Sequence, residues 1–381
     1  MRSIKSICKS LIGRVETIRK SRLDHKTFKD KYQHVVVFES DDWGSIRMSN
    51  RKDWEELLRM GYAVDKRPYE RFDTLESPDD LSALFDVLLK HKDMNGNHPI
   101  ITANMLMTNP DFENIEKSGF QEYHYESISD TYRRYYGDTR VLELMRQGID
   151  EGLFMPQSHG REHFNVEQWM IGLRNGNEDL LTAFRHGMCG IAPKLHPDKG
   201  NKIMNALLAQ NDKEQEEIDR IVSEGLILFE KQWGFKSKSF VAPCYLWDER
   251  TEQTLSDGGV EMIQTQRDCK AAYKSPSRKF YAGQKNGYGQ IYNIRNCFFE
   301  PSTSESGSSV DSLIAQVDNT FSMHKIAVFS THRINYVGGI DEQNRKRTLN
   351  LLDYFLTKLL KKYPDTVFLS SDKLIEIYNK K

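Results

Sequence analysis

The chain has 381 residues, with 54 lysines and arginines against 55 aspartates and glutamates, for a formal net charge of −1. This balance excludes a protein whose main task is the electrostatic binding of nucleic acid. Hydrophobic residues make up 38% of the chain, enough for a large core. No stretch of the chain approaches the ~18–20 consecutive apolar residues needed to span a bilayer. The five cysteines are odd in number and lack metal-binding spacing, which indicates reduced thiols in a cytosolic protein.

Residues 1–31 are predicted to be a basic leader rather than a secretory signal, because they lack an uninterrupted apolar core and a small-residue cleavage site. Apolar residues recur at three- and four-residue spacing from Ile4 to Ile18, and basic residues fill much of the remainder. A basic amphipathic helix of this kind can lie on an anionic membrane, so residues 1–22 are a candidate for peripheral contact with the inner membrane face. The alternatives are a helix packed on the body of the protein and a disordered leader.

From residue 32 onward, apolar segments rich in β-branched residues alternate with helical patterns. Strands are expected to begin near His34, His98, Gly152, Ser239, Gly259, Ile291, Lys325 and Thr366. Helices are expected over Leu81–Lys90, Val141–Gly148, Val166–Leu173, Asn201–Glu230, Glu249–Leu255, Ser308–Phe321, Asn344–Lys362 and Asp372–Tyr378. Such alternation predicts a parallel sheet with crossover helices, and seven or eight such units close most easily into a barrel. Residues 32–381 are therefore predicted to form a single α/β domain, a (β/α)7–8 barrel.

Two adjacent carboxylates, Asp41 and Asp42, stand where the first strand should end. Neighbouring strand residues point to opposite faces, but a turn at Gly44 can bring both carboxylates into one site at the rim. Two carboxylates that share a site repel each other unless a metal ion or a shared proton relieves the repulsion. The ordinary alternative is an aspartate pair in a loop or helix cap.

The segment Ser158–His163 follows a short apolar run and carries two histidines, His159 and His163. Imidazoles at positions i and i+4 lie on one face of a helical turn and can reach one divalent ion. With one aspartate they would supply three protein ligands and leave a fourth position open, which is typical of a catalytic zinc site.

Two further strand ends carry residues that do chemistry or bind sugars. Lys325–Arg333 is a short apolar strand that ends in His332, and Ser239–Trp247 places a proline, a tyrosine and a tryptophan after another strand. In (β/α) barrels the catalytic residues come from the C-terminal ends of strands, so this placement favours an enzyme. Two aromatic-rich stretches, Tyr123–Tyr136 and Ala271–Gln290, either stack on sugar rings or pack as long loops on the barrel.

These motifs resemble those of the polysaccharide deacetylases, a family of metal-dependent carbohydrate esterases with a distorted (β/α) barrel. FESDDWG at 38–44 is similar to the family's first motif, T-F-D-D-G, and HGREH at 159–163 to its second, H-S/T-x-x-H. VAPCYLW at 241–247 is similar to the third motif, R-x-P-Y, and AVFSTHR at 327–333 to a late motif that ends in L-x-H. The matches occur in the family's order and look closest to a divergent branch found among bacterial surface-glycan genes.

The resemblance implies that Asp42, His159 and His163 hold one divalent metal ion. Zn²⁺ is favoured by the two imidazoles, although Co²⁺, Ni²⁺ and Mn²⁺ also suit a mixed Asp/His site. Asp41 would be the general base that deprotonates the attacking water, and His332 the general acid that protonates the leaving amine or alcohol. The backbone N–H of Tyr245 would stabilise the oxyanion. The implied substrate-binding residues are Trp43 and Trp247, as walls of the sugar pocket, with Arg161, Arg333 and Glu300.

The chain departs from the family pattern in its third and fourth motifs. Val241 stands where the family has the arginine that orients the base, so Arg161 or Arg333 is expected to supply that charge. The fourth motif is assigned to Asn296–Pro301, with Glu300 facing the site.

The sequence thus predicts a hydrolase that removes an acetyl group from an acetylated saccharide or glycan intermediate, in the cytosol or at the inner membrane face. Three alternatives remain open. HGREH also satisfies H-x-x-E-H, the inverted zinc-protease motif with Glu162 as base, if the segment is helical. Asp41 and Glu300 as paired carboxylates would instead hydrolyse a glycosidic bond. A catalytically silent barrel would bind glycan without turnover.

Overall fold

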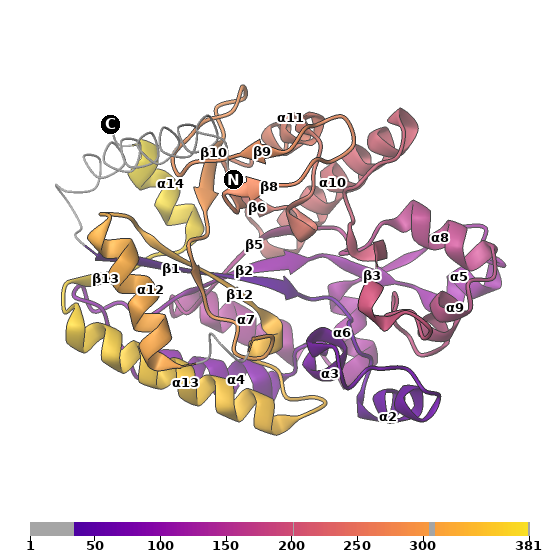
Figure 1. Ribbon diagram of the computed structural model, residues 1–381, viewed down its shortest axis with the longest axis horizontal. Coiled ribbons are helices and arrows are strands. Elements are labelled where there is room, and N and C mark those ends of the chain that lie inside the picture. The colour runs from indigo at the N-terminus through magenta and orange to yellow at the C-terminus, as the bar shows by residue number, and fades with distance from the viewer. Residues whose placement is uncertain (1–33, 201, 305–308, 380–381) are drawn as a thin grey trace, which may run out of the picture.

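The computed structural model describes residues 34–200, 202–304 and 309–379 (Figure 1). The leader expected over residues 1–31, with its membrane-contact segment 1–22, lies outside the described residues and stays a prediction, as does the cytosolic setting. None of the helices in the described ranges has both the length and the apolar character needed to cross a bilayer.

A curled sheet of nine strands, paired in parallel, forms the centre of the molecule. The strands run in the order β10 (Ile291–Ile294), β7 (Met262–Thr265), β6 (Ser239–Val241), β5 (Phe154–Gly160), β2 (Ile101–Leu106), β1 (His34–Trp43), β12 (Ala327–His332) and β11 (Cys297–Phe298), with β13 (Thr366–Phe368) also paired to β1. The eight strands expected from the sequence are all present. The predicted fold class, a distorted (β/α) barrel in one domain, is confirmed.

The barrel is closed by one short segment that belongs to both edges of the sheet. β10 pairs with β7, and after Arg295 and Asn296 the same chain segment continues as β11, which pairs with β12. The N–H of Arg295 still donates to the carbonyl of Thr265, whereas the N–H of Asn296 donates to the carbonyl of Val328. Arg295 therefore lies at the seam of the barrel, at the same end as the carboxyl termini of the strands.

Long helices cover the outside of the sheet (Figure 1). They are α4 (Pro78–Leu88), α7 (Arg140–Asp150), α10 (Asp212–Trp233), α11 (Glu249–Asp257), α12 (Val310–Ser322) and α13 (Glu342–Lys362). A further helix, α14 (Ser371–Asn379), packs on the opposite face of β1. Side-chain caps precede α4, α10, α11, α12 and α13, and at α4 Ser77 and Asp80 form a capping box. α10 begins at Asp212 rather than near Asn201, because Asn211 is the residue whose side chain accepts the N–H of Glu214.

Shorter elements gather at the C-terminal ends of β1, β2 and β5, where the site lies (Figure 1). The helices are α2 (Arg51–Arg59), α3 (Pro68–Phe72), α5 (Phe112–Lys117), α6 (Ile128–Tyr136), α8 (Val166–Arg174) and α9 (Glu178–Arg185). β3 (Thr108–Pro110) pairs with β4 (Tyr125–Ser127), and β8 (Asp268–Cys269) pairs with β9 (Arg278–Lys279), both antiparallel. Short 3₁₀ turns are η1 (Pro197–Lys199), η2 (Lys202–Met204), η3 (Pro243–Tyr245) and η4 (Arg333–Asn335).

The central strand β1 shows how the sheet is buried on both faces. Val36 and Phe38 pack into the main core cluster beneath the outer helices. Val35 and Val37 pack on the opposite face, against Val328 and Leu374 of α14. A strand covered on both sides needs apolar residues at every position, which explains its continuous apolar run. The run ends at Glu39, and from there the barrel interior becomes polar.

Candidate active site

The carboxyl end of β1 is distorted, and the distortion brings the two aspartates to one rim. The register of β1 against β2 shifts between Ser40 and Trp43. Asp42 has a φ of +76°, in the left-handed region that side chains other than glycine rarely adopt. Gly44 follows at +84°, and a Cβ there would lie 2.6 Å from the carbonyl oxygen of Leu106. The turn expected at Gly44 is present, but the decisive backbone change occurs two residues earlier.

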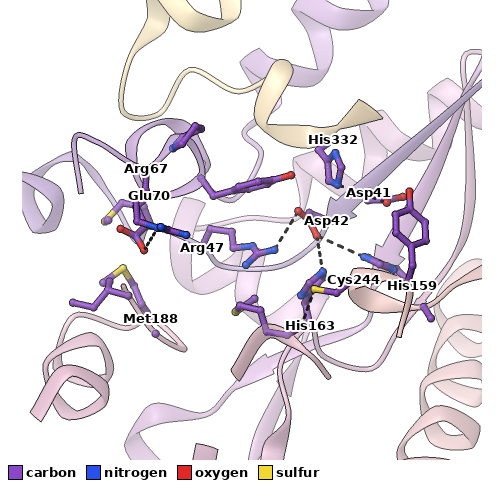
Figure 2. A pocket seen from close by; sticks show the side chains of 18 residues that line it. Asp41, Asp42, Arg47, Arg67, Glu70, His159, His163, Met188, Cys244 and His332 are labelled. Atoms are coloured by element: carbon purple, nitrogen blue, oxygen red, sulfur yellow. Dashed lines mark hydrogen bonds and ion pairs between the residues drawn. The ribbon is translucent and has the colours of Figure 1, made fainter. Parts of the chain in front are cut away.

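Asp42 meets the two histidines of β5 and its following loop, and these three residues form the Asp42 cluster. Asp42 Oδ1 lies 3.3 Å from Nε2 of His163 and 3.6 Å from Nε2 of His159. The two imidazole rings are 5.0 Å apart between centroids, and all three side chains are buried. The three residues expected to bind a metal ion therefore converge, as Figure 2 shows.

The protonation of the two histidines leaves lone pairs for a metal ion. His159 Nδ1 lies 2.8 Å from the carbonyl of Val241, and because a carbonyl only accepts, Nδ1 carries the proton and Nε2 is free to coordinate. Burial and the charge of Arg47 lower the pKa of His163 to about 3, so this ring is neutral beside Asp42. The contact is therefore not an ion pair.

Two facing atoms of the Asp42 cluster, Asp42 Oδ1 and His159 Nε2, are buried without a hydrogen-bond partner in the described part of the chain, and His163 turns its Nε2 toward the same carboxylate oxygen. Buried polar atoms of this kind are costly unless something pairs with them. One carboxylate and two imidazoles are the donor set of a catalytic zinc site with an open position. The residues present therefore fit a divalent metal ion.

Arg47 holds the other side of Asp42. Its Nη2 lies 3.3 Å from Asp42 Oδ2, and its guanidinium stacks over Tyr69 at 5.4 Å from the ring centroid. Burial alone would raise the pKa of Asp42, but Arg47 and the neighbouring histidines hold it well below its usual range. Asp42 is therefore a carboxylate with one oxygen fixed by Arg47 and the other directed at the histidines.

Asp41 belongs to a separate group, the Asp41 network, in which every partner is supplied by the protein. Arg295 makes a bidentate contact with Asp41, from Nη1 to Oδ2 at 2.6 Å and from Nη2 to Oδ1 at 2.7 Å. Asn104 donates to Oδ1 at 2.7 Å. Arg295 also donates from Nε to Glu39 at 2.8 Å and from Nη2 to Gln264 at 2.9 Å. Burial would raise the pKa of Asp41, but Arg295 outweighs it and lowers the pKa to about 2.

His332 forms the third wall of the site, at the end of β12. Its Nδ1 lies 2.5 Å from Glu300 Oε1, and its Nε2 lies 3.8 Å from Asp41 Oδ2. Asn335 donates to the second oxygen of Glu300 at 2.9 Å, and Tyr69 contacts the imidazole edge to face. Burial alone would lower the pKa of His332, but the charge of Glu300, helped by Asp41, raises it to about 9. His332 is thus a cation at neutral pH.

A pocket of about 300 Å³ opens over these three groups. Its lining includes Asp41, Asp42 and His332 at one end, and Figure 2 shows it extending past Arg47 toward Arg67, Glu70 and Met188. A buried carboxylate, a candidate metal site and a cationic histidine therefore face one cavity. This arrangement suits the addition of water to a carbonyl group with proton transfer to a leaving group.

Comparisons with known proteins are informative only at the level of three-dimensional structure. No model of a known protein family matches the chain, and no curated protein matches it. Peptidoglycan deacetylase PdaC from Bacillus subtilis is similar with a TM-score of 0.39 at 8% sequence identity, over 91% of this chain and 92% of that one. A CE4 family pseudoenzyme from Bacillus anthracis has a TM-score of 0.38 at 10% identity, over 91% of this chain and 66% of that one.

A third solved structure of similar shape has a different activity. 4-α-glucanotransferase from Thermococcus litoralis matches with a TM-score of 0.44 at 11% identity, over 90% of this chain and 40% of that one. Similarity at this level carries no activity to this chain.

The two arginines expected to replace the missing third-motif arginine lie elsewhere, and that prediction was wrong. Arg161 is buried against Glu162 and Glu224, and Arg333 is buried against Asp73 and Glu76. Neither lines the pocket, so neither binds substrate there. Arg295 performs the role instead, and it follows directly after β10, a strand that the sequence did indicate.

Trp43 and Trp247 were expected to wall the sugar pocket, and this was also wrong. Trp43 is 1% exposed and packs against Phe154 and Tyr336 in the core. Trp247 is 2% exposed and stacks on Phe280. A large apolar ring after a strand is buried more readily than it is displayed. The aromatic stretches Tyr123–Tyr136 and Ala271–Gln290 likewise contribute no residue to this pocket.

Two further expectations are corrected by hydrogen bonds. The backbone N–H of Tyr245 donates to the carbonyl of Ala242 at 2.9 Å, so it is not available to an oxyanion. Glu300 does not line the pocket and so does not bind substrate; it faces the site, as expected, through its bond to His332.

The inverted zinc-protease interpretation fails on the local fold. That motif must lie in a helix, but His159 and Gly160 end the strand β5. Glu162, its required base, accepts from Arg161 at 2.7 Å and from Tyr123 at 2.9 Å.

Proposed function

We propose that the protein is a metal-dependent hydrolase that removes an acetyl group from the nitrogen or oxygen of a sugar. The observation that supports this most strongly is the Asp42 cluster, in which the unpartnered atoms Asp42 Oδ1 and His159 Nε2 and the Nε2 of His163 converge in one pocket with Asp41 and His332. The order of the motifs, which resembles that of polysaccharide deacetylases, points to the same reaction.

Asp42, His159 and His163 would hold the ion, with Zn²⁺ first among the candidates. Bound there, the ion would polarise the acetyl carbonyl and lower the pKa of a water molecule. These ligands are oriented before any ion binds. The carbonyl of Val241 fixes the tautomer of His159, and Arg47 holds one oxygen of Asp42 so that the other stays free.

Asp41 accepts the proton of the attacking water. It is ionised at neutral pH, and Arg295 and Asn104 fix its orientation. The water oxygen bonds to the acetyl carbon, the bond from that carbon to the sugar nitrogen or oxygen breaks, and the products are acetate and an amine or alcohol. Asp41 is thus a positioned general base.

His332 supplies the proton that the leaving group needs. Glu300 keeps its imidazole protonated, and Asn335 holds Glu300 in place. The proton travels from the imidazole to the departing nitrogen or oxygen, so that the sugar leaves as a neutral amine or alcohol.

A glycosidase that uses Asp41 and Glu300 is less well supported by the same contacts. Such an enzyme needs one protonated carboxylic acid and one free carboxylate. Here both groups are engaged by cations, Asp41 by Arg295 and Glu300 by His332. Arg295 lowers the pKa of Asp41 to about 2, so Asp41 is not the protonated acid, and Glu300 does not line the pocket.

The proposal is tested by acetate release from acetylated saccharides after removal and return of the metal. We expect activity in the metal-loaded protein, loss with a chelator, and recovery with Zn²⁺ or Co²⁺. Asp41→Asn should keep the metal and lose activity by about 10²–10⁴-fold. A protein that binds no divalent ion, even when supplied with it, would contradict the proposal and favour a silent barrel.

A further inference from the structure

A wall bounds the pocket at the end opposite the reacting groups. Figure 2 places Arg67, Glu70 and Met188 at that end, away from His332. The wall is built by two segments that are distant in sequence: α3 with its N-cap Arg67, and residues 188–200, which follow α9.

Two hydrogen bonds join the two segments of this wall. The Arg67 guanidinium donates from Nη1 to the carbonyl of Pro197 at 2.8 Å. The N–H of Ala192 donates to Glu70 Oε1 at 2.7 Å, and Arg67 Nε lies 3.6 Å from the same oxygen. Two charged side chains of the α3 segment thus hold the backbone of residues 188–200, and hydrogen bonds to charged groups are a strong class.

An apolar cluster supports the wall from behind. Met188 is 0% exposed and Ile191 is 3% exposed, although both line the pocket. The other buried members of this cluster are Met48, Leu57, Tyr62, Val64, Ala183 and Ile340. The wall is therefore continuous with a packed core, and it is not a flap that could swing aside at little cost.

The dimensions of the cavity limit what can enter it. A volume of about 300 Å³ is at the lower end of the ~300–1,000 Å³ usual for ligand pockets and leaves room for about one sugar ring with its acetyl group. The lining residue Cys244 is exposed and marks the mouth. An interior residue of a polymer needs two ways out of a site, one for each neighbour in the chain.

We propose that this pocket accepts a terminal acetylated sugar residue, either a small saccharide or the end of a glycan intermediate, and excludes interior residues of a polymer. The inference rests on the proposed function and adds the substrate class to it. The apolar side chains of Met48, Met188 and Ile191 face the ring and the acetyl methyl, and the acetyl carbonyl lies at the Asp42 end.

The test compares short and long substrates that carry the same acetyl group. One pair is the disaccharide of N-acetylglucosamine and soluble glycol chitin; the other is acetylated xylobiose and acetylated xylan. We expect metal-loaded protein to release acetate per acetyl group at least about tenfold faster from the short member of the pair that it accepts. On a pentasaccharide, mass spectrometry should locate the loss at a terminal residue. Activity on the free disaccharide but not on the pentasaccharide end would assign a small saccharide.

Equal rates on both members, or loss from interior residues, would overturn the inference and leave the deacetylase intact. 4-Nitrophenyl acetate serves as a size-independent reporter. If the reporter is hydrolysed and no saccharide is, the inference fails; if neither is hydrolysed, the proposed function itself fails.

A second test disrupts the wall by substitution. Arg67→Ala with Glu70→Ala removes both bridging hydrogen bonds without touching the Asp42 cluster. We expect the polymer-to-disaccharide rate ratio to rise at least about fivefold. Lys66→Ala is the matched control, because this exposed neighbour pairs with Asp65 and does not line the pocket. Thermal unfolding checks that the variants fold, and Arg67→Ala alone replaces the double variant if that one does not. An unchanged ratio in a folded variant would overturn the inference.

Discussion

Asp41 and Asp42 are neighbours in sequence but lie in opposite kinds of environment. In the Asp41 network the protein supplies the partners: Arg295 and Asn104 donate three hydrogen bonds to the carboxylate, and Glu39, Gln264 and the hydroxyl of Tyr245 accept the other N–H groups of the guanidinium. In the Asp42 cluster the facing atoms Asp42 Oδ1 and His159 Nε2 have no hydrogen-bond partner among the described residues. The first arrangement is complete once the chain folds, whereas the second becomes complete only when a cation binds.

The Asp41 network and the Asp42 cluster therefore contribute differently to stability and to metal binding. A saturated network of buried charges holds its members rigidly, but breaking it leaves charges unpaired in a low dielectric. An unsaturated cluster destabilises the folded chain and binds a cation strongly for the same reason. Metal binding should therefore stabilise the folded state, while the Asp41 network should be insensitive to metal.

The largest expected effect is the loss of a ligand. We expect His163→Ala and Asp42→Ala to lose stoichiometric metal and at least about 10³-fold of the acetate-releasing activity. Metal should raise the melting temperature of the wild type and leave that of His163→Ala unchanged. Metal analysis and calorimetry measure both. Asp41→Asn is the control that should stay loaded, and loss of metal there would erase the distinction between the two halves.

A substitution in the Asp41 network should lower the stability of the fold as its first effect, ahead of any effect on catalysis. Arg295→Met leaves Glu39 and Asp41 buried without their cation, so the free energy of unfolding should fall by about 3–5 kcal/mol. Urea unfolding of the metal-free protein measures this. Arg295→Lys keeps the charge but loses the two-pronged contact, so it should recover part of the stability and little of the activity. Stability unchanged in Arg295→Met would show that the network is not saturated as described.

A moderate effect is expected on the pH dependence. His332 must be protonated to act as an acid, and Glu300 raises its pKa to about 9, so activity should persist to about pH 9 and fall above it. Glu300→Gln removes the negative charge and keeps the shape, so the alkaline limb of kcat/KM should move down by at least about one pH unit. Glu300→Asp, which keeps the charge, is the control. An unmoved limb in Glu300→Gln would assign the acid to another group.

The smallest effect is expected for a residue outside both the Asp41 network and the Asp42 cluster. Trp247→Phe keeps the stacking on Phe280 and loses one hydrogen bond, from the indole N–H to Glu252 at 2.9 Å, so stability should fall by about 1 kcal/mol. KM should stay within about twofold, because the ring does not line the pocket. A large rise in KM without loss of stability would restore Trp247 to the sugar site.

Much of the framework could be predicted from the sequence because strand ends are marked by composition. Apolar runs placed eight strands, and the rule that their carboxyl ends meet brought Asp41, Asp42, His159, His163 and His332 to one rim. Helix starts were less certain, since α10 depends on which of several polar residues caps it. Glu300 was placed near the site, but its bond to His332 required the three-dimensional arrangement.

The missed residues fall into two kinds. Arg295 had a usable signal: it directly follows a strand that the sequence indicated, so the same strand-end rule reaches it. Arg47 and Tyr69 had none, because they come from loops and a five-residue helix whose course is set by tertiary packing. The tryptophans were misassigned because a motif position records where a residue stands in the chain and not which way its side chain turns.

The backbone of Asp42 has a consequence for selection. Its left-handed φ is a conformation that glycine adopts freely and that other residues adopt at an expense of order 1–3 kcal/mol. A chain selected only for a robust fold would carry glycine here, and such a replacement would also discard an unpaired buried oxygen. Position 42 is therefore where fitness for folding and fitness for catalysis favour different residues, and the aspartate that stands there is evidence of which one has prevailed.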